Sequence, residues 1–458
     1  MFTLALLPRA VLICLGIWLN AADSLVTATI MPSVVRNIGG YAYFAWPVAT
    51  YLLGSILGGA SAGHFARSRG LRTALVASAF PYIAGCGMSA LAGSMAIFLA
   101  GRFLQGAGAG LIVGLSYVSV NTLFPGTHYR RVMALLSGVW GVATLFGPLL
   151  GGLFSHGSDW QILFAMFAGQ GVIFIVAALF LVPQIVVADV ETRVPVRTLA
   201  VLSLAVIANL IAGVLGNIAW AAGSLALAIA LLVAALRGDA SAPVHLFPRR
   251  VAHLRDNAGQ GYLAIFALNA SCVGFSVYGA AILQAAYGLS PLYAGYVICM
   301  EAAGWTIMAL IVAELPHSSD SFWIRAGVSV AVLSVISLIF TLPSGSIGAV
   351  FASAAALGGG FGAFWAFLTR RILEFLPPAE KTLGAGAIPT TQMLGNAVGA
   401  AFCGLIANAL GVAHGFDRAN ALSASVWLFA CAVPVALFGW FCAWRMSVGL
   451  VQSGADIT

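Results

Sequence analysis

Long apolar segments alternate with short polar ones along almost the entire chain. A helix needs about 20 apolar residues to cross the roughly 30 Å hydrocarbon layer of a bilayer, and these segments reach that length. They run unbroken, without the alternation of a barrel strand, and lipid leaves only helices or closed barrels as spanning structures. The pattern therefore predicts fourteen spans, at residues 8–33, 42–64, 73–91, 96–121, 131–155, 161–182, 198–216, 218–236, 259–285, 291–313, 323–341, 345–369, 383–410 and 423–444.

The composition excludes several classes of protein. Of the 458 residues, 61% are apolar and 7% are charged. A soluble domain carries about 25% charged residues, so this chain does not have enough polar surface to be soluble. We exclude a soluble enzyme, a secreted disulfide scaffold and a disordered regulator, and we predict an all-α integral membrane protein.

No residue pattern indicates a metal or a cofactor. The seven cysteines lie inside apolar segments without paired spacing, and the seven histidines fall in or beside loops without a repeated ligand spacing. The GxxxxGK[ST] phosphate-binding motif does not occur in the sequence. The net charge of +7 comes from arginines spread over many loops. We therefore expect no enzyme activity, no cofactor, no metal and no nucleic-acid partner.

The distribution of basic residues orients the predicted spans. With the N-terminus inside, seventeen of the twenty basic residues fall in inside segments, two in outside loops and one within a span. Cytoplasmic loops of membrane proteins carry such an excess of arginine and lysine. We expect both termini to be cytoplasmic, in a bacterial cytoplasmic (inner) membrane.

The middle of the chain decides between twelve and fourteen spans. The 39 residues between Arg197 and Arg237 contain no charged side chain and break near Gly216 and Asn217. The segment therefore forms either a hairpin that crosses twice or a stretch that never enters the membrane, and we prefer the hairpin. The predicted domains are two six-helix bundles, at residues 1–185 and 259–458, separated by an inserted hairpin at 186–237 and a cytoplasmic linker at 238–258.

Three charged residues lie well inside the predicted spans: Asp23, Arg102 and Glu301. At 1.5 Å per residue, both acids lie roughly 15 Å from the outer ends of their helices and Arg102 roughly 9 Å from its own. Charges in lipid are costly and mark functional sites, and a carboxyl group that alternates between wet and dry surroundings can load and release a proton. The alternatives are a fixed Asp23 to Arg102 ion pair that only joins helices, and a Glu301 that faces water in a purely solvating role.

Two glycine runs occupy the fourth span of each predicted half. Residues 106–110 read GAGAG and residues 357–362 read LGGGFG. A dinucleotide-binding fingerprint needs a preceding strand, so close helix packing explains these glycines better. Their matching positions indicate an internal repeat, and transporters with such repeats bind substrates near the bilayer midplane.

Several motifs resemble the major facilitator superfamily, specifically its fourteen-span drug:proton antiporters, over essentially the whole chain. Asp23 is followed by Pro32, LAGRFLQGAGAG spans 99–110, and GVWGVATLFGPLLGG spans 138–152. The resemblance implies the major facilitator fold and a proton-transfer role for Arg102. It also implies a bend and a tight contact in the fifth helix that limit leak, formed by Gly147, Pro148, Gly151 and Gly152. One departure is Arg67, which occupies the position of the usual loop aspartate.

Aromatic and polar residues inside the spans are candidates for the wall of a substrate cavity, because rings can stack on a flat or cationic ligand. Ordinary helix packing is the alternative for each of them. The candidates are Trp18, Gln105, Tyr117, Trp140, Gln170, Asn269, Tyr278, Tyr296, Trp305, Trp365, Gln392 and Asn396.

Together these features predict a secondary active exporter that exchanges protons for an amphiphilic or cationic small molecule. The other hypotheses are a dedicated exporter of a natural metabolite such as a siderophore, with Arg102 as substrate ligand, a proton symporter, a lipid flippase and a non-transporting receptor. The expected partners are a small-molecule substrate, protons and membrane lipids, and the expected assembly is a monomer.

Overall fold

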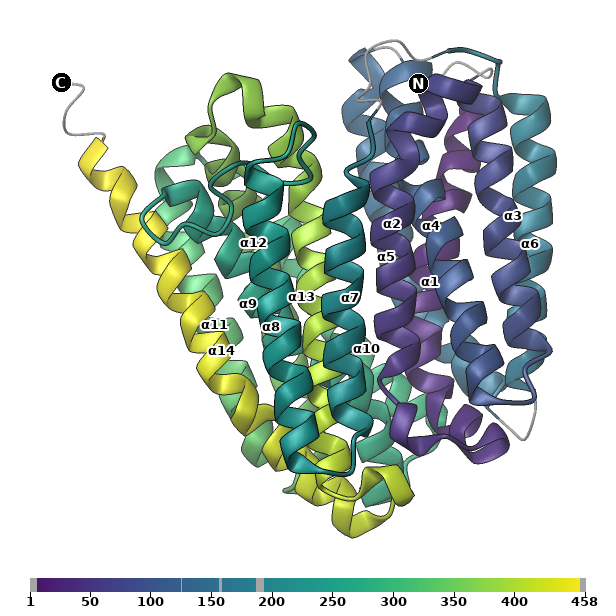
Figure 1. Cartoon of the computed structure of the whole chain (residues 1–458), viewed down its shortest axis with the longest axis vertical. Coiled ribbons are helices and arrows are strands. Elements are labelled where there is room, and N and C mark those ends of the chain that lie inside the picture. The colour runs from purple at the N-terminus through teal and green to yellow at the C-terminus, as the bar shows by residue number, and fades with distance from the viewer. Residues whose placement is uncertain (1–5, 125, 156–158, 187–192, 454–458) are drawn as a thin grey trace. The chain divides into compact units, whose positions relative to one another are not determined.

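The structure, a computed structural model, describes residues 6–124, 126–155, 159–186 and 193–453, and both chain ends lie outside this described part. The chain forms two compact units, Met1–Pro195 and Val196–Thr458. In each unit, long helices lie side by side (Figure 1). The first unit contains α1 (Leu7–Ile38), α2 (Trp46–Arg69), α3 (Leu71–Ala90), α4 (Met95–Leu123), α5 (Gly126–Leu153) and α6 (Trp160–Leu181).

The second unit contains the remaining eight long helices of the described chain. Two of them, α7 (Val196–Val214) and α8 (Ile218–Ala240), precede a linker without regular structure. The other six are α9 (Asn257–Tyr287), α10 (Pro291–Val312), α11 (Asp320–Thr341), α12 (Ile347–Phe375), α13 (Lys381–Ala409) and α14 (Arg418–Ser453).

The predicted all-α fold with fourteen helices is confirmed. Most helices extend beyond the apolar segments that predicted them; α1, for example, continues to Ile38 with Pro32 inside it. Twelve of the helices are long and apolar enough to cross a membrane by their own length and composition. The exceptions, α2 and α13, are rich in glycine, with several serines in α2 and several threonines in α13, which lowers hydropathy but suits close packing against neighbouring helices.

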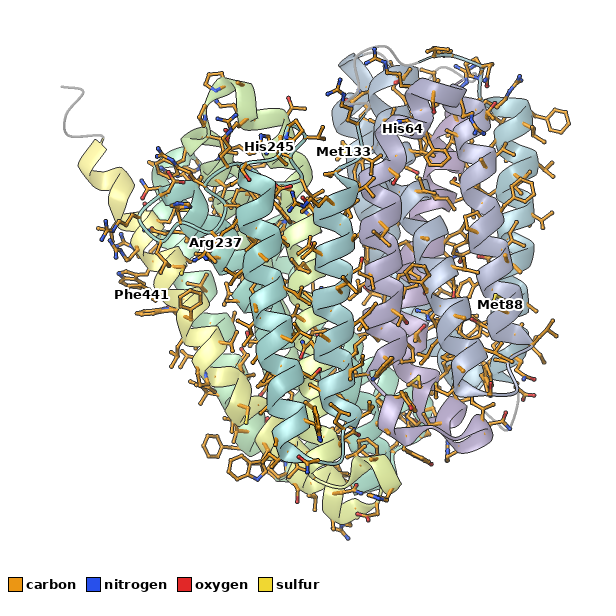
Figure 2. All side chains as sticks on the ribbon, viewed as in Figure 1. His64, Met88, Met133, Arg237, His245 and Phe441 are labelled. Atoms are coloured by element: carbon orange, nitrogen blue, oxygen red, sulfur yellow. The ribbon has the colours of Figure 1, made fainter. Side chains whose placement is uncertain are left out.

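The predicted hairpin is formed by α7 and α8 and belongs to the second unit, where α7 packs against α13. Two asparagines join these helices: Asn209 donates a hydrogen bond to the backbone carbonyl of Val398 at 3.0 Å, and Asn408 donates to that of Gly213 at 2.8 Å. Hydrogen bonds of this kind hold helices together in lipid. Arg237 lies near the end of α8 and His245 in the following linker (Figure 2). The domain boundaries proposed from sequence remain a prediction.

The glycine run of α4 lets two helices approach it on opposite sides. A methyl group at Gly106 would overlap the carbonyl of Tyr51 on α2, and one at Gly110 would overlap that of Ser55. On the other side, a methyl at Gly108 would meet Tyr82 of α3. The packing function predicted for this run is confirmed.

The glycine run of α12 packs in the same way within the second unit. Gly358 and Gly362 lie against the backbone of α10 at Glu301 and Trp305. Gly360 faces α11 at Ala331. The order of contacts along α12 matches that along α4, which confirms an internal repeat in which α2, α3 and α4 correspond to α10, α11 and α12.

We expect Gly358→Ala to destabilise the protein by about 1–3 kcal/mol, since the added methyl would overlap the rigid backbone carbonyl of Glu301. Gly359 is the matched control, because a methyl there would contact nothing within 4 Å. Gly359→Ala should be neutral or stabilising by up to about 1 kcal/mol, as alanine favours helix. Thermal unfolding of both purified variants in detergent checks this, and equal behaviour would contradict it.

Candidate functional site

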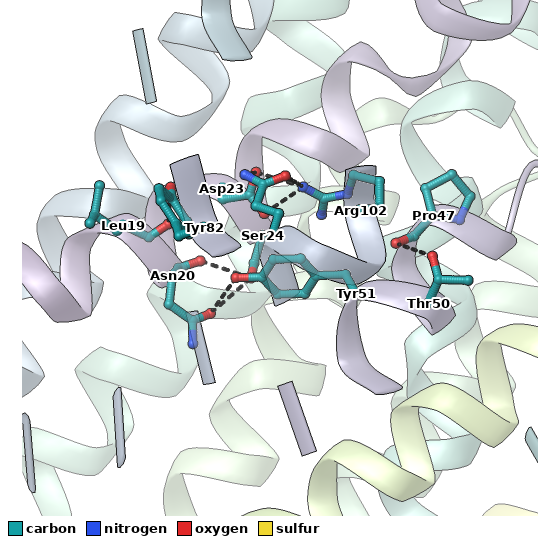
Figure 3. Close-up of polar contacts among 10 residues, drawn as sticks. Leu19, Asn20, Asp23, Ser24, Pro47, Thr50, Tyr51, Tyr82 and Arg102 are labelled. Atoms are coloured by element: carbon teal, nitrogen blue, oxygen red, sulfur yellow. Dashed lines mark hydrogen bonds and ion pairs between the residues drawn. The ribbon is translucent and has the colours of Figure 1, made fainter. Parts of the chain in front are cut away.

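The charged residues predicted inside the first unit form a buried ion pair. Arg102 Nη1 of α4 donates to both carboxylate oxygens of Asp23 of α1, at 2.8 Å each (Figure 3). It also donates to Gln105 Oε1 at 2.7 Å, and Gln105 Nε2 in turn donates to Asp23 Oδ1 at 3.0 Å. The three side chains are essentially inaccessible, with at most 1% exposed. We call Asp23, Arg102 and Gln105 the α1–α4 polar cluster.

Aromatic rings enclose this cluster. The Arg102 guanidinium carbon lies 4.4 Å from the ring centre of Tyr51 and 5.8 Å from that of Phe164 on α6. The Tyr51 hydroxyl donates to Asn20 Oδ1 at 3.3 Å, one turn before Asp23 on α1. Because Gly106 brings the Tyr51 backbone directly against α4, the glycine run and the cluster are parts of one local arrangement.

The cluster balances one positive and one negative charge in a dry environment. Removal of either partner would leave a buried charge without compensation, which is far more costly than the pair itself. One donor of the arginine, Nε, is buried and makes no hydrogen bond within the described part of the chain. Two roles are chemically open to the cluster. Asp23 can take up a proton when Arg102 moves away from it, or the ion pair can stay intact and simply hold α1 against α4.

The acid of the second unit has different surroundings. Glu301 of α10 is partly buried, and its Oε2 accepts a hydrogen bond from the Ser276 hydroxyl of α9 at 2.9 Å. Among the described residues, no basic side chain lies within ion-pair distance of Glu301. A lone carboxyl group at this depth is cheaper to bury in its neutral form, and its charged form needs water or a cation.

Aromatic side chains continue from Glu301 along the same face of α10. Trp305 follows one helical turn later, and residues four apart share a face. Its ring stacks on Phe361 of α12 with centroids 5.2 Å apart, and it lies 5.4 Å from Trp365. An acid beside tryptophan rings combines charge and cation–π attraction, which is how proteins bind organic cations.

The glycines of the fifth helix pack tightly against α1. A methyl group at Gly147 would lie 2.7 Å from Leu25 Cβ, and one at Gly151 would lie 2.7 Å from Thr29 Cβ. Pro148 lies between them inside α5, and Gly152 follows at a half-buried position. These contacts agree with the close helix packing that the resemblance implies, on the same helix as Asp23.

The other predicted cavity residues are scattered over the two units. In the first unit, Trp18 donates to Gln170 Oε1 at 3.2 Å, while Tyr117 and Trp140 are 45% and 43% exposed. In the second, Tyr278 is buried with its ring 6.3 Å from Phe416. The remaining candidates are only partly exposed or buried: Asn269, Tyr296, Gln392 and Asn396.

Residues 13–400 match the sequence model described as Major Facilitator Superfamily. The chain belongs to this superfamily. It is therefore a multi-pass membrane transporter and not an enzyme, and the resemblance to this superfamily noted in the sequence is confirmed.

Named relatives of this major facilitator transporter include drug exporters. A Mycobacterium tuberculosis protein named "Probable multidrug-efflux transporter" is 29% identical over 425 residues, 88% of each chain. A multidrug transporter protein of Bacillus subtilis is 25% identical over 162 residues, which cover 35% of this chain and 30% of that one.

Solved structures show the same fold. A bacterial homologue of the human lysosomal transporter Spinster, in an inward-facing, unoccupied conformation, has a TM-score of 0.70 and 13% identity, covering 98% of this chain and 99% of that one. A peptide transporter in complex with sulfate has a TM-score of 0.69 and 15% identity, covering 97% and 95%. At these identities the likeness concerns the fold alone.

Sequence reasoning missed several polar residues of this transporter. Asn20 accepts a hydrogen bond from Tyr51, and Ser276 donates one to Glu301, but small polar residues are common in such helices. Asp320 of α11 is fully buried and pairs with Arg370 and with Arg371 Nε, the latter at 2.6 Å. Charges at span ends are ordinary, so hydropathy gave no reason to single it out.

Proposed function

We propose that this transporter is a proton-coupled exporter of amphiphilic or cationic small molecules, working as an antiporter. The observation that carries the proposal is Glu301, an acid without a basic partner in the described chain, one helical turn before Trp305, whose ring stacks on Phe361. A relative named for multidrug efflux, aligned over 88% of this chain, supports the direction of transport and the breadth of substrate.

The two polar sites take different roles in this proposal. Glu301 binds either a proton or the positive charge of the substrate, so that each displaces the other. In the α1–α4 polar cluster, Asp23 accepts a proton when Arg102 releases it. Arg102 is a proton-coupling residue rather than a substrate ligand, because its Nη1 is already engaged by Asp23 and Gln105.

Localisation and assembly complete the proposal. The arginine bias supports cytoplasmic positions for both termini, and the proposed location is a bacterial cytoplasmic membrane. The working unit in this proposal is a monomer in the lipid bilayer, with a small-molecule substrate and protons as its partners.

Everted membrane vesicles test the proposal. A proton gradient is generated and reported by a quenched pH-sensitive dye, and cationic, neutral and anionic amphiphiles of similar size are added in turn. We expect dequenching with cationic compounds only, and none in vesicles without the protein. Dequenching by anionic compounds alone would favour a metabolite exporter, and ligand binding without any proton movement would favour a receptor.

A further inference from the structure

A cavity lies within the second unit, below the linker that joins α8 to α9. Its volume is about 90 Å³, which is room for a short hydrocarbon segment. The inserted hairpin contributes Leu232 and Leu236, the linker Phe247 and Val251, and α9 and α13 the rest of the wall, including Leu263 and Leu394. The cavity is partly open to the surroundings of the protein.

The wall of this cavity is almost entirely apolar, although two polar residues line it. The Tyr262 hydroxyl donates to the backbone carbonyl of Gly384 at 2.8 Å, and the Thr391 hydroxyl donates to that of Ala387 at 2.8 Å. Since both hydroxyl groups are already bonded within the protein, the surface offered to an occupant consists of carbon. Such a surface favours an alkyl chain over a polar solute.

The linker that covers the cavity is held in place by a buried acid. Asp239, 2% exposed at the end of α8, accepts hydrogen bonds from the backbone amides of Leu246 and Phe247, each at 2.9 Å from its nearer oxygen. It also accepts one from the Thr198 hydroxyl of α7 at 2.8 Å. These hydrogen bonds hold Phe247 against the cavity, so the fold itself fixes the position of the linker that covers the cavity.

Two arginines lie in the same linker, between the lining residues Phe247 and Val251. Arg249 and Arg250 are both exposed, and the Arg250 side chain, 75% exposed, lies 3.9 Å from the Asp256 carboxylate. The charge bias predicts this end of the helices to be cytoplasmic. The backbone carbonyl of Arg250 packs against Gly259 of α9, and the lining residues of α9 lie roughly 5–11 Å further along that helix.

We propose that this cavity and the two arginines form a binding site for one anionic phospholipid of the bilayer, with a short segment of an acyl chain in the cavity and the headgroup at Arg249 and Arg250. The spacing matches a lipid, whose acyl chain begins just below its phosphate. The apolar wall alone would not select a lipid, because bilayer chains are as apolar as leucine. The arginines supply the preference for an anionic headgroup.

The position of the site indicates what the lipid does. Helix α8 packs against α7, and α7 in turn against α13. A lipid chain between Leu232 of α8 and Leu263 of α9 fills the space that these contacts leave, and it therefore fastens the inserted hairpin to the rest of the second unit.

Native mass spectrometry of the full chain in detergent tests this proposal. Phosphatidylglycerol and phosphatidylcholine with identical acyl chains are titrated separately, and the bound lipids are counted. We expect one phosphatidylglycerol to bind preferentially. The double variant Arg249→Gln with Arg250→Gln should weaken it about 25-fold, at roughly fivefold per arginine near a lipid surface. Leu263→Trp, which fills the cavity, should also remove the tightly bound molecule.

The matched control removes two arginines at the opposite helix ends, Arg36→Gln with Arg418→Gln, and should keep the preference. Equal losses in both double variants would indicate general attraction to a basic protein and overturn the proposal. Phosphatidylcholine bound as tightly as phosphatidylglycerol, or an undiminished affinity in the Arg249 and Arg250 variant, would overturn it as well. If Leu263→Trp does not fold, Leu232→Trp on α8 fills the cavity from its other side.

Discussion

Replacing Glu301 by glutamine is expected to uncouple transport while leaving the fold intact. Glutamine has nearly the same shape and still accepts the hydrogen bond from Ser276, but it neither carries a proton nor attracts a cation. Exchange of one proton for one monovalent cation moves no net charge, so the pH gradient drives it, at about 1.4 kcal/mol per pH unit. Losing the proton should lower the steady-state accumulation of a cationic substrate in everted vesicles about tenfold for each pH unit of gradient, together with the dye response.

A matched control separates this effect from the loss of any acid. Glu314 follows α10 at an exposed position, and Glu314→Gln should transport like the wild type. Thermal unfolding of the Glu301→Gln protein should change little, because a partly buried charge is removed without a cavity. Undiminished exchange in Glu301→Gln would show that the acid is not part of the coupling, whatever its neighbours.

Replacing Asp23 by asparagine is expected to destabilise the protein by about 3–5 kcal/mol. The change leaves the guanidinium of Arg102, 1% exposed, without its counter-charge. Thermal unfolding in detergent measures the loss. The same variant should also fail to transport, so this variant alone does not distinguish a proton carrier from a structural ion pair.

The double variant Asp23→Asn with Arg102→Gln makes that distinction. Both charges are then removed, and two amides can hydrogen-bond to each other and to Gln105, so most of the lost stability should return. We expect proton-driven exchange to remain absent. A stable double variant that transports with the normal response to a pH gradient would mean that the pair only holds α1 to α4.

The number and order of helices could be predicted from hydropathy because the bilayer imposes a single length and polarity on every span. The ion-pair partner of Arg102 could not be predicted from the sequence. Depth along a helix follows from the sequence, but the direction in which a side chain points around its helix depends on packing. The sequence thus left Asp23 and the substrate as alternative partners of Arg102, and in the structure Arg102 donates to Asp23.

The roles of the glycines were predicted only in part. Their spacing indicated close packing, yet nothing in GAGAG specifies that alternate glycines face α2 and α3. Likewise, Asp239 and Asp320 gave no signal, because a charge at a span end satisfies the ordinary polarity pattern even when it is fully buried. In these cases the sequence periodicity does not predict which neighbouring helix a residue faces.

The repeated glycine contacts have a consequence for how such transporters diversify. At Tyr51 in the first unit and Glu301 in the second, the glycine of the neighbouring helix touches the backbone carbonyl and not the side chain. The close contact between the helices therefore does not depend on which side chain stands there, and a tyrosine in one half can correspond to an acid in the other. A substitution at Glu301 keeps this contact, whereas one at Tyr51 also removes the ring that covers Arg102.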